Sequence, residues 1–185
     1  MGIQPHIIKK CENVINENDF DFVICSLHTC DKKDLYTGDF FAGKTPKKAY
    51  IKYFEELLYC VKNFESFNVV GHLNILVRYN KEVANENIRN YFDILEEIFK
   101  TLIEKNKGIE INTSGFRYNL NNIMPTVEVI KFYKELGGEI ITTGSDSHIP
   151  DTLAQKFDYV YDVLKYVGFK YISTFEKMEP KFIKI

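Results

Sequence analysis

One segment of the chain joins an apolar run to two groups that can bind a metal ion. Residues 139–143 have the pattern of a short strand, and the turn after them presents Asp146 and His148, two residues apart. Carboxylate and neutral imidazole are the usual ligands of zinc, manganese and iron in proteins. The segment therefore indicates metal-assisted chemistry.

Two earlier strand-like segments also end in histidine. Residues 22–28 end at His28, and residues 68–72 end at His72. When strands alternate with helices around a barrel, side chains at their carboxyl ends meet at one mouth. We therefore expect His28, His72, Asp146 and His148 to share a metal site. His6 has no such placement and is interpreted as a helix-end or surface residue.

A second polar group follows residues 108–112, which alternate like a strand. Asn112, Ser114 and Arg117 would bring an amide, a hydroxyl and a guanidinium to the same mouth. The guanidinium fork matches phosphate oxygens, so the group suits an oxyanion. Arg78, six residues beyond His72, is a second candidate for this duty. The alternative for Arg117 is a surface ion pair.

The cysteines allow one competing interpretation. Cys25, His28 and Cys30 could form part of a structural zinc site, which would make the protein a metal binder instead of an enzyme. No second cysteine pair at ligand spacing is present, and Cys25 lies in an apolar run that favours packing. We expect the four cysteines to be reduced thiols: Cys11, Cys25, Cys30 and Cys60.

The segments that must position these residues alternate between strand and helix patterns. Apolar residues at helical spacing predict a short helix after Pro5 and longer helices over residues 45–61, 85–105, 125–136 and 150–167. Residues 170–174 predict a fifth strand. The order favours a parallel sheet with crossover helices, although five strands are few for a closed barrel. The polar segment 31–44 follows a ligand-bearing strand and could line a pocket.

Composition limits the classes of protein. The 185 residues are 45% hydrophobic with five prolines, which is enough for one compact domain. A formal net charge of −2 without a basic stripe argues against a nucleic-acid partner. No apolar stretch reaches the length of a membrane span, and the N-terminus has no signal-peptide pattern. We expect a soluble, cytoplasmic protein with no membrane partner.

Four motifs in this order and spacing resemble the polymerase and histidinol phosphatase (PHP) family, in its histidinol-phosphate phosphatase branch. They are residues 26–28, 71–74, 110–117 and 144–148, and the resemblance covers nearly the whole chain. It implies a distorted seven-stranded barrel with a trinuclear metal cluster at its mouth. By resemblance, His28 and His72 would hold one metal, Asp146 a second and His148 a third, and Arg117 would grip phosphate.

The sequence departs from the family pattern at its start. The family begins with a strand that carries a His-x-His pair and supplies a bridging glutamate just before the point where this chain starts. We therefore interpret residues 1–185 as the C-terminal portion of a single PHP-type phosphoesterase domain, an incomplete (β/α)7 TIM-like barrel of about five units. Fewer than three metals and weak or absent activity are expected. Asn74 stands where related sequences commonly have aspartate, which would alter support around His72.

The resemblance implies a metal-dependent phosphate-monoester hydrolase, with L-histidinol phosphate of histidine biosynthesis as the favoured substrate and zinc, manganese or iron as cofactor. The implied catalytic residues are Asp146, His148 and Arg117, and the implied substrate-binding residues are Arg117, Ser114, Asn112 and Arg78. One alternative is a noncatalytic binding domain that forms a homo-oligomer through open sheet edges. Another alternative is a phosphoesterase that acts on a different small phosphorylated substrate. Residues 31–44 would then decide which substrate is bound.

Overall fold

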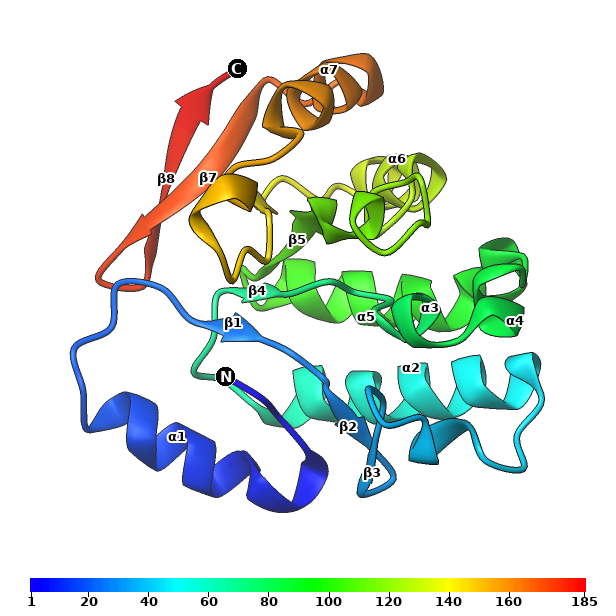
Figure 1. The fold of residues 1–185 in the computed structure, drawn as a ribbon. Coiled ribbons are helices and arrows are strands. Elements are labelled where there is room, and N and C mark those ends of the chain that lie inside the picture. Colours follow the sequence, from blue (N-terminus) through cyan, green and yellow to red (C-terminus); the bar gives the residue numbers. More distant parts are fainter.

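The computed structural model describes residues 1–185, and a parallel sheet lies at its centre (Figure 1). Its four strands are β1 (Ile24–Cys25), β4 (Val69–Val70), β5 (Gly108–Asn112) and β6 (Ile141–Gly144), which lie side by side in chain order. Helix α2 (Pro46–Asn63) precedes β4, α5 (Phe92–Glu104) precedes β5, and α6 (Val127–Glu135) precedes β6. The predicted alternation around a parallel sheet is confirmed.

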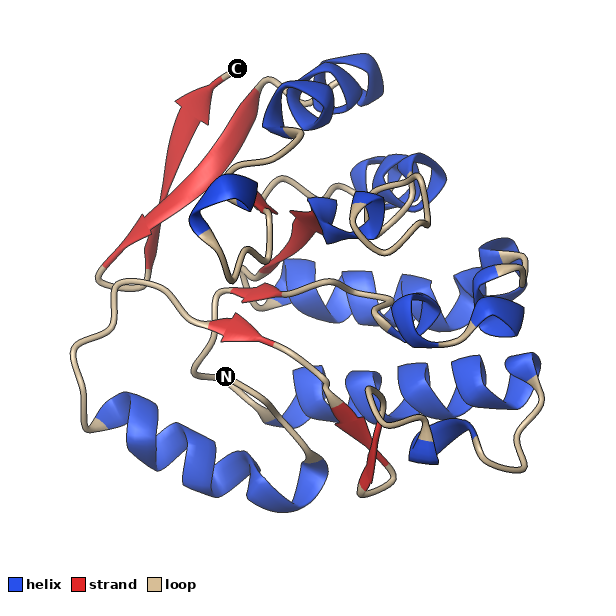
Figure 2. Cartoon of the chain, in the orientation of Figure 1, coloured by secondary structure: helices blue, strands red, loops and turns tan.

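The helices stack beside the sheet and bury an apolar face against it. Figure 2 shows α2, α5, α6 and α7 (Phe157–Val167) along one side of the short strands. Thr45 accepts the backbone N–H of Lys48 at 3.3 Å and Pro46 takes the first helical position, so α2 begins where the sequence predicts. The largest fully buried side chains are aromatic, and they include Tyr50, Tyr53, Phe54, Phe99 and Tyr133.

Two predicted helices are shorter than expected because the backbone leaves helical geometry. Residues 85–105 form the 3-10 turn η3 (Ile88–Tyr91) and then α5, since Tyr91 has a φ of −121° and a ψ of 13°. Residues 150–167 divide into η5 (Pro150–Thr152) and α7, because Lys156 has a φ of +66°. The first helix is η1 (Pro5–Ile7) followed by α1 (Ile8–Asn16). The short helices α3 (Leu76–Tyr79) and α4 (Lys81–Ala84) follow β4.

The predicted fifth strand exists but does not join the parallel sheet. Strand β7 (Tyr171–Glu176) pairs antiparallel with β8 (Glu179–Lys184) in a separate two-stranded sheet. The intervening Lys177 and Met178 have φ values of +51° and +66°, which makes a tight two-residue turn. The hairpin contacts β6 through a side chain, and its turn contacts the segment before β1. Ser173 Oγ accepts the N–H of Ile141 at 3.3 Å, and Met178 N–H donates to Asp21 O at 3.0 Å.

Extended residues at the N-terminus cover the outer edge of β1. Gly2 forms a parallel bridge with Ser26, and Ile3 N–H donates to Ser26 O at 2.9 Å. After β1, the small hairpin of β2 (Thr29–Cys30) and β3 (Lys33–Asp34) leads into η2 (Asp39–Phe41). Phe40 and Phe41 are buried, so the polar segment 31–44 is anchored to the core at this point.

The proposed cysteine zinc site does not form. All four cysteines are free and buried, whereas His28 is exposed. No three His, Cys, Asp or Glu side chains lie close enough together to hold a metal ion, and Cys25 and Cys30 belong to the hydrophobic core. Packing therefore explains both cysteines. None of the helices has the length and hydropathy that a membrane span requires.

Candidate metal and phosphate site

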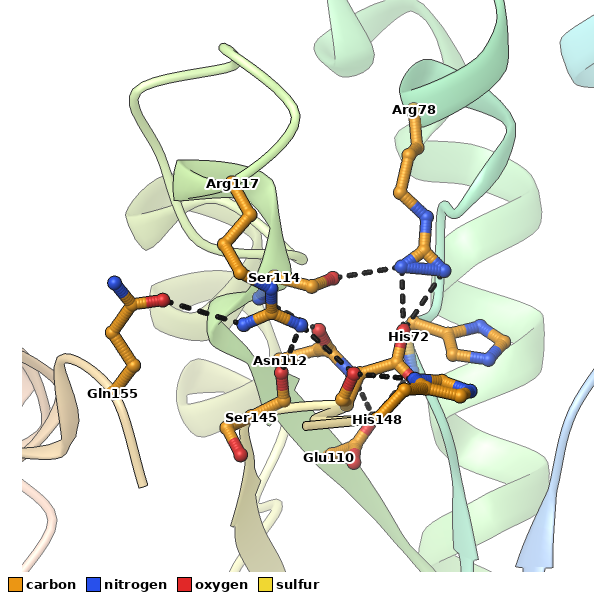
Figure 3. Close-up of polar contacts among 10 residues, drawn as sticks. His72, Arg78, Glu110, Asn112, Ser114, Arg117, Ser145, His148 and Gln155 are labelled. Atoms are coloured by element: carbon orange, nitrogen blue, oxygen red, sulfur yellow. Dashed lines mark hydrogen bonds and ion pairs between the residues drawn. The ribbon is translucent and has the colours of Figure 1, made fainter. Parts of the chain in front are cut away.

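The carboxyl ends of the parallel strands bring the candidate residues together. His28 follows β1, His72 follows β4, Asn112 ends β5, and Asp146 follows β6. Figure 3 shows the polar contacts that connect the residues after β4, β5 and β6. The candidate residues follow the strands at this edge of the sheet, because parallel strands end on the same side.

His28 and His72 form a close pair. Their ring centroids are 4.9 Å apart and their planes cross at 72°. Burial lowers the pKa of His72 to about 3, and partial desolvation lowers the pKa of the more exposed His28, so both imidazoles are neutral near neutral pH. The Nδ1 atom of His72 is buried and has no hydrogen-bond partner. Neutral imidazoles with an unpaired ring nitrogen have the chemistry of metal ligands.

The backbone around His72 has an unusual conformation. His72 has a φ of +28°, and its N–H donates to Glu110 Oε2 at 2.8 Å. The preceding Gly71 lies against β1, where a Cβ atom would be 2.6 Å from Ile24 Cγ2 and 2.8 Å from Ser26 Oγ. A side chain at position 71 would collide with both. The glycine therefore lets β4 end close to β1 and present His72 beside His28.

Asp146 is paired with Arg78. Asp146 Oδ2 accepts hydrogen bonds from Arg78 Nη1 at 2.5 Å and Nη2 at 2.9 Å, whereas Oδ1 accepts none. Arg78 Nη1 also donates to Ser114 Oγ at 3.0 Å. The Arg78 side chain is only 5% exposed. Arg78 therefore binds one carboxylate oxygen of Asp146, a predicted metal ligand. Arg78 is also the second candidate for phosphate binding in the sequence.

Arg117 has a different set of partners. Its Nη2 donates to the carbonyl oxygens of Ser145 at 2.6 Å and Asp146 at 2.8 Å, and its Nη1 donates to Gln155 at 3.5 Å (Figure 3). The guanidinium thus holds the turn after β6. In this arrangement Arg117 fixes the backbone of Asp146, and Arg78 is the guanidinium beside the carboxylate and the Ser114 hydroxyl.

His148 is exposed and lies on the turn that carries Asp146. Its Nδ1 is 3.0 Å from the carbonyl oxygen of Asp146, two residues earlier. The structure therefore brings the four predicted ligands to one edge but groups them as two local pairs. His28 pairs with His72, and His148 lies on the turn of Asp146. Closer approach of the two groups would be needed for one shared ion.

Sequence reasoning missed the role of Glu110. This residue is 6% exposed, and Oε2 accepts hydrogen bonds from the His72 N–H and from Asn112 Nδ2, the second at 3.0 Å. Burial raises the pKa of the Glu110 carboxyl. The signal in the sequence was a single charged residue inside residues 108–112, a strand that proves to be buried at every position.

A groove of about 550 Å³ lies beside Arg78. Its lining includes Tyr79 and Tyr118, and the centre of the guanidinium is 5.3 Å and 4.5 Å from the centres of these two rings. Tyr36, which is 77% exposed, contacts Tyr79 edge to face at 5.8 Å. The segment 31–44 therefore reaches this groove through Tyr36.

Comparison with known proteins gives consistent results. Residues 1–114 match the family described as PHP domain. The histidinol-phosphatase of Lactococcus lactis subsp. lactis is 33% identical over 184 residues, which cover 97% of this chain and 67% of that protein. A relative from Clostridium acetobutylicum is 29% identical over 160 residues, covering 85% of this chain and 62% of the relative.

Solved structures show the same relationship. The crystal structure of the Lactococcus lactis histidinol phosphate phosphatase, complexed with zinc, L-histidinol and phosphate, has a TM-score of 0.88 at 32% identity. The similarity covers 98% of this chain and 69% of that one. A Listeria monocytogenes structure has a TM-score of 0.68 at 16% identity, which indicates a shared fold. The chain thus spans about two thirds of the length of these relatives.

Proposed function

The chain belongs to the PHP domain family, and from this premise we propose that it serves in the metal-dependent hydrolysis of histidinol phosphate. The proposal is supported by 33% identity to a histidinol-phosphatase across 97% of the chain. The observation that carries it is the neutral His28–His72 pair at the same sheet edge as Asp146, Arg78 and Ser114. The arrangement would join a metal-binding pair to a phosphate-binding group.

We interpret the fold as part of a distorted (β/α)7 barrel, with the four parallel strands as its wall and the β7–β8 hairpin beside β6. Residues 1–185 would then belong to a single phosphoesterase domain. The Lactococcus relative is longer than this chain, which covers 67% of it.

After a closer approach of the His28–His72 pair and the turn that carries Asp146 and His148, these four residues would hold zinc, manganese or iron. The unpartnered Nδ1 of His72 and the unpaired Oδ1 of Asp146 fit this role, since both can donate electrons to a cation without losing an existing hydrogen bond. A bound divalent ion would supply a water ligand of lowered pKa and would neutralise phosphoryl charge. Desolvation lowers the pKa of both imidazoles, which keeps them neutral and therefore ready to bind.

Arg78 and Ser114 would bind the phosphate. The guanidinium and the hydroxyl are already 3.0 Å apart, and a phosphate could accept hydrogen bonds from both. Asn112 shapes this turn because its Oδ1 accepts the Ser114 N–H at 3.0 Å. Arg117 would position Asp146 through its carbonyl and would add positive charge near the transferred group. The groove beside Arg78 is wide enough for the organic part of a small ester.

Two measurements on the purified chain test the proposal. The first is the zinc content after dialysis, with Asp146→Asn as the ligand-loss variant. The second is calorimetric binding of L-histidinol phosphate, compared with glycerol phosphate and with a nucleotide monophosphate. Zinc retention and preferential binding of L-histidinol phosphate are expected. Absence of both would contradict the proposed function, and preference for another ester would favour the alternative substrate class.

A second function is favoured by the exposed edge of β8. This strand pairs only with β7, and its Phe182 and Ile183 are 51% and 48% exposed. An unpaired strand edge with exposed apolar side chains can pair with a second copy. Sedimentation analysis would detect such a homo-oligomer, and a monomer at high concentration would count against an assembly role.

A further inference from the structure

The Glu110 carboxylate lies between Gly71 and Gly144. A Cβ atom at Gly144 would be 2.0 Å from Glu110 Oε1, and a Cβ atom at Gly71 would be 3.4 Å from Oε2. These glycines stand at the ends of the two strands that flank β5, namely β4 and β6. The two glycines therefore leave space on β4 and β6 for the Glu110 carboxylate, next to the candidate site.

The carboxylate has no cationic partner in the structure. None of the ion pairs of the chain includes Glu110, although its side chain is almost completely buried. Its contacts are instead two donors on Oε2, the backbone N–H of His72 and the amide of Asn112. Burying a carboxylate without a countercharge is unfavourable, so the position calls for a specific role.

The two donors connect Glu110 to both halves of the site. Through the His72 N–H, it contacts the backbone of a predicted metal ligand at a residue with positive φ. Through Asn112, it reaches Ser114, whose N–H donates to Asn112 Oδ1 and whose Oγ accepts from Arg78. A continuous series of hydrogen bonds thus links the histidine pair to the phosphate-binding residues (Figure 3).

We propose that Glu110 is the positioning residue that holds His72 in the orientation needed for metal binding and fixes it relative to the Ser114 turn. The inference rests on the proposed function, because it takes His72 as a metal ligand. Glu110 acts by accepting the His72 N–H, which holds the backbone of His72 where its imidazole faces His28. It touches neither metal nor substrate.

Three variants separate this role from a general effect on folding. Glu110→Ala removes the acceptor, whereas Glu110→Gln keeps an oxygen at the Oε2 position and removes the charge. The matched control is Asn68→Ala at the opposite end of β4. Asn68 is 3% exposed and its Oδ1 accepts the Val23 N–H at 2.8 Å, the same kind of contact at the same distance.

The first readout is zinc affinity measured by competition with a chelator. Loss of a group that orients a metal ligand lowers metal affinity about 10- to 100-fold, and we expect this for Glu110→Ala. Glu110→Gln should stay within about threefold of wild type because the accepting oxygen remains. Asn68→Ala should leave the affinity unchanged. Equal losses in Glu110→Ala and Glu110→Gln, or no loss in either, would overturn the inference.

The second readout does not require a metal. Amide hydrogen exchange of His72, measured by NMR in the metal-free protein, should accelerate more than about tenfold in Glu110→Ala and stay unchanged in Asn68→Ala. Unchanged exchange at His72 in Glu110→Ala would refute the positioning role, even if wild type binds zinc. Failure of wild type to bind zinc would instead refute the metal site, while the exchange result would still decide the role of Glu110.

Discussion

Replacement of Arg78 by methionine should have opposite effects on metal and phosphate binding. Arg78 donates two hydrogen bonds to one oxygen of Asp146, and the two side chains are only 5% and 23% exposed. A metal ion at Asp146 must share the carboxylate with this guanidinium and is also repelled by its charge. Arg78→Met removes both effects, so zinc affinity should rise while phosphate affinity should fall.

The size of the effect follows from the geometry. Two unit charges about 4 Å apart interact by about 4 kcal/mol at an effective dielectric constant of about 20. Desolvation and rearrangement offset much of this in a partly buried pair, which leaves about 1.4 kcal/mol, or about a tenfold increase in zinc affinity. A hydrogen bond to a charged group contributes about 1.5–3 kcal/mol, so inorganic phosphate should bind at least about tenfold more weakly.

Chelator competition would measure zinc affinity, and calorimetry would measure phosphate affinity of the zinc-loaded protein. Arg89→Met is the matched control, because Arg89 forms an exposed pair with Glu128 at 2.8 Å away from the site. This variant should change neither affinity. Weaker zinc binding by Arg78→Met would refute the reasoning, since it would mean that Arg78 supports the metal ligand instead of competing for it.

Three further predictions concern the same sheet edge. His28→Ala should lose bound zinc, measured by elemental analysis, whereas His6→Ala should retain it. The metal-free protein should lose about 2 kcal/mol of unfolding free energy between about pH 6.5 and about pH 5. The reason is that unfolded His72 binds a proton below its ordinary pKa of 6.5, while the folded residue, with a pKa of about 3, does not. Urea titrations of His72→Gln should show a smaller pH dependence, and an unchanged slope would contradict this assignment. Gly144→Ala should lower stability by about 1–3 kcal/mol, because the new methyl group would displace the buried Glu110 carboxylate. A thermal or urea midpoint equal to that of wild type would exclude this clash.

Much of the architecture could be predicted from local patterns. The Thr45–Pro46 start of α2 and the alternation of helices with β1, β4, β5 and β6 follow from spacing and capping, which act between near neighbours in sequence. The placement of the histidines and of Asp146 at strand ends follows from the same patterns. Parallel strands then bring these ends to one side, whatever the details of packing.

Contacts between residues that are distant in sequence could not be predicted in the same way. The sequence pattern of β7 predicts a strand but does not identify the strand with which it pairs. Its antiparallel pairing with β8 depends on the turn at Lys177 and Met178. Arg117 and Arg78 look alike in sequence, but only Arg78 contacts the Asp146 carboxylate, while Arg117 is held by two backbone carbonyls. Their roles were therefore decided by side-chain contacts between residues distant in sequence.

The sequence by itself determined the elements, the strand ends and the residue types that meet there, because periodicity, capping and ligand chemistry are local properties. The tertiary structure alone decided that His28 lies against His72, that Arg78 holds Asp146, and that Glu110 lies under His72. These pairings depend on how closely β1, β4, β5 and β6 and the residues that follow them approach one another. Gly71 lets β4 end close to β1, and Gly144 leaves space for the Glu110 carboxylate; both effects exist only when the neighbouring strands are in place.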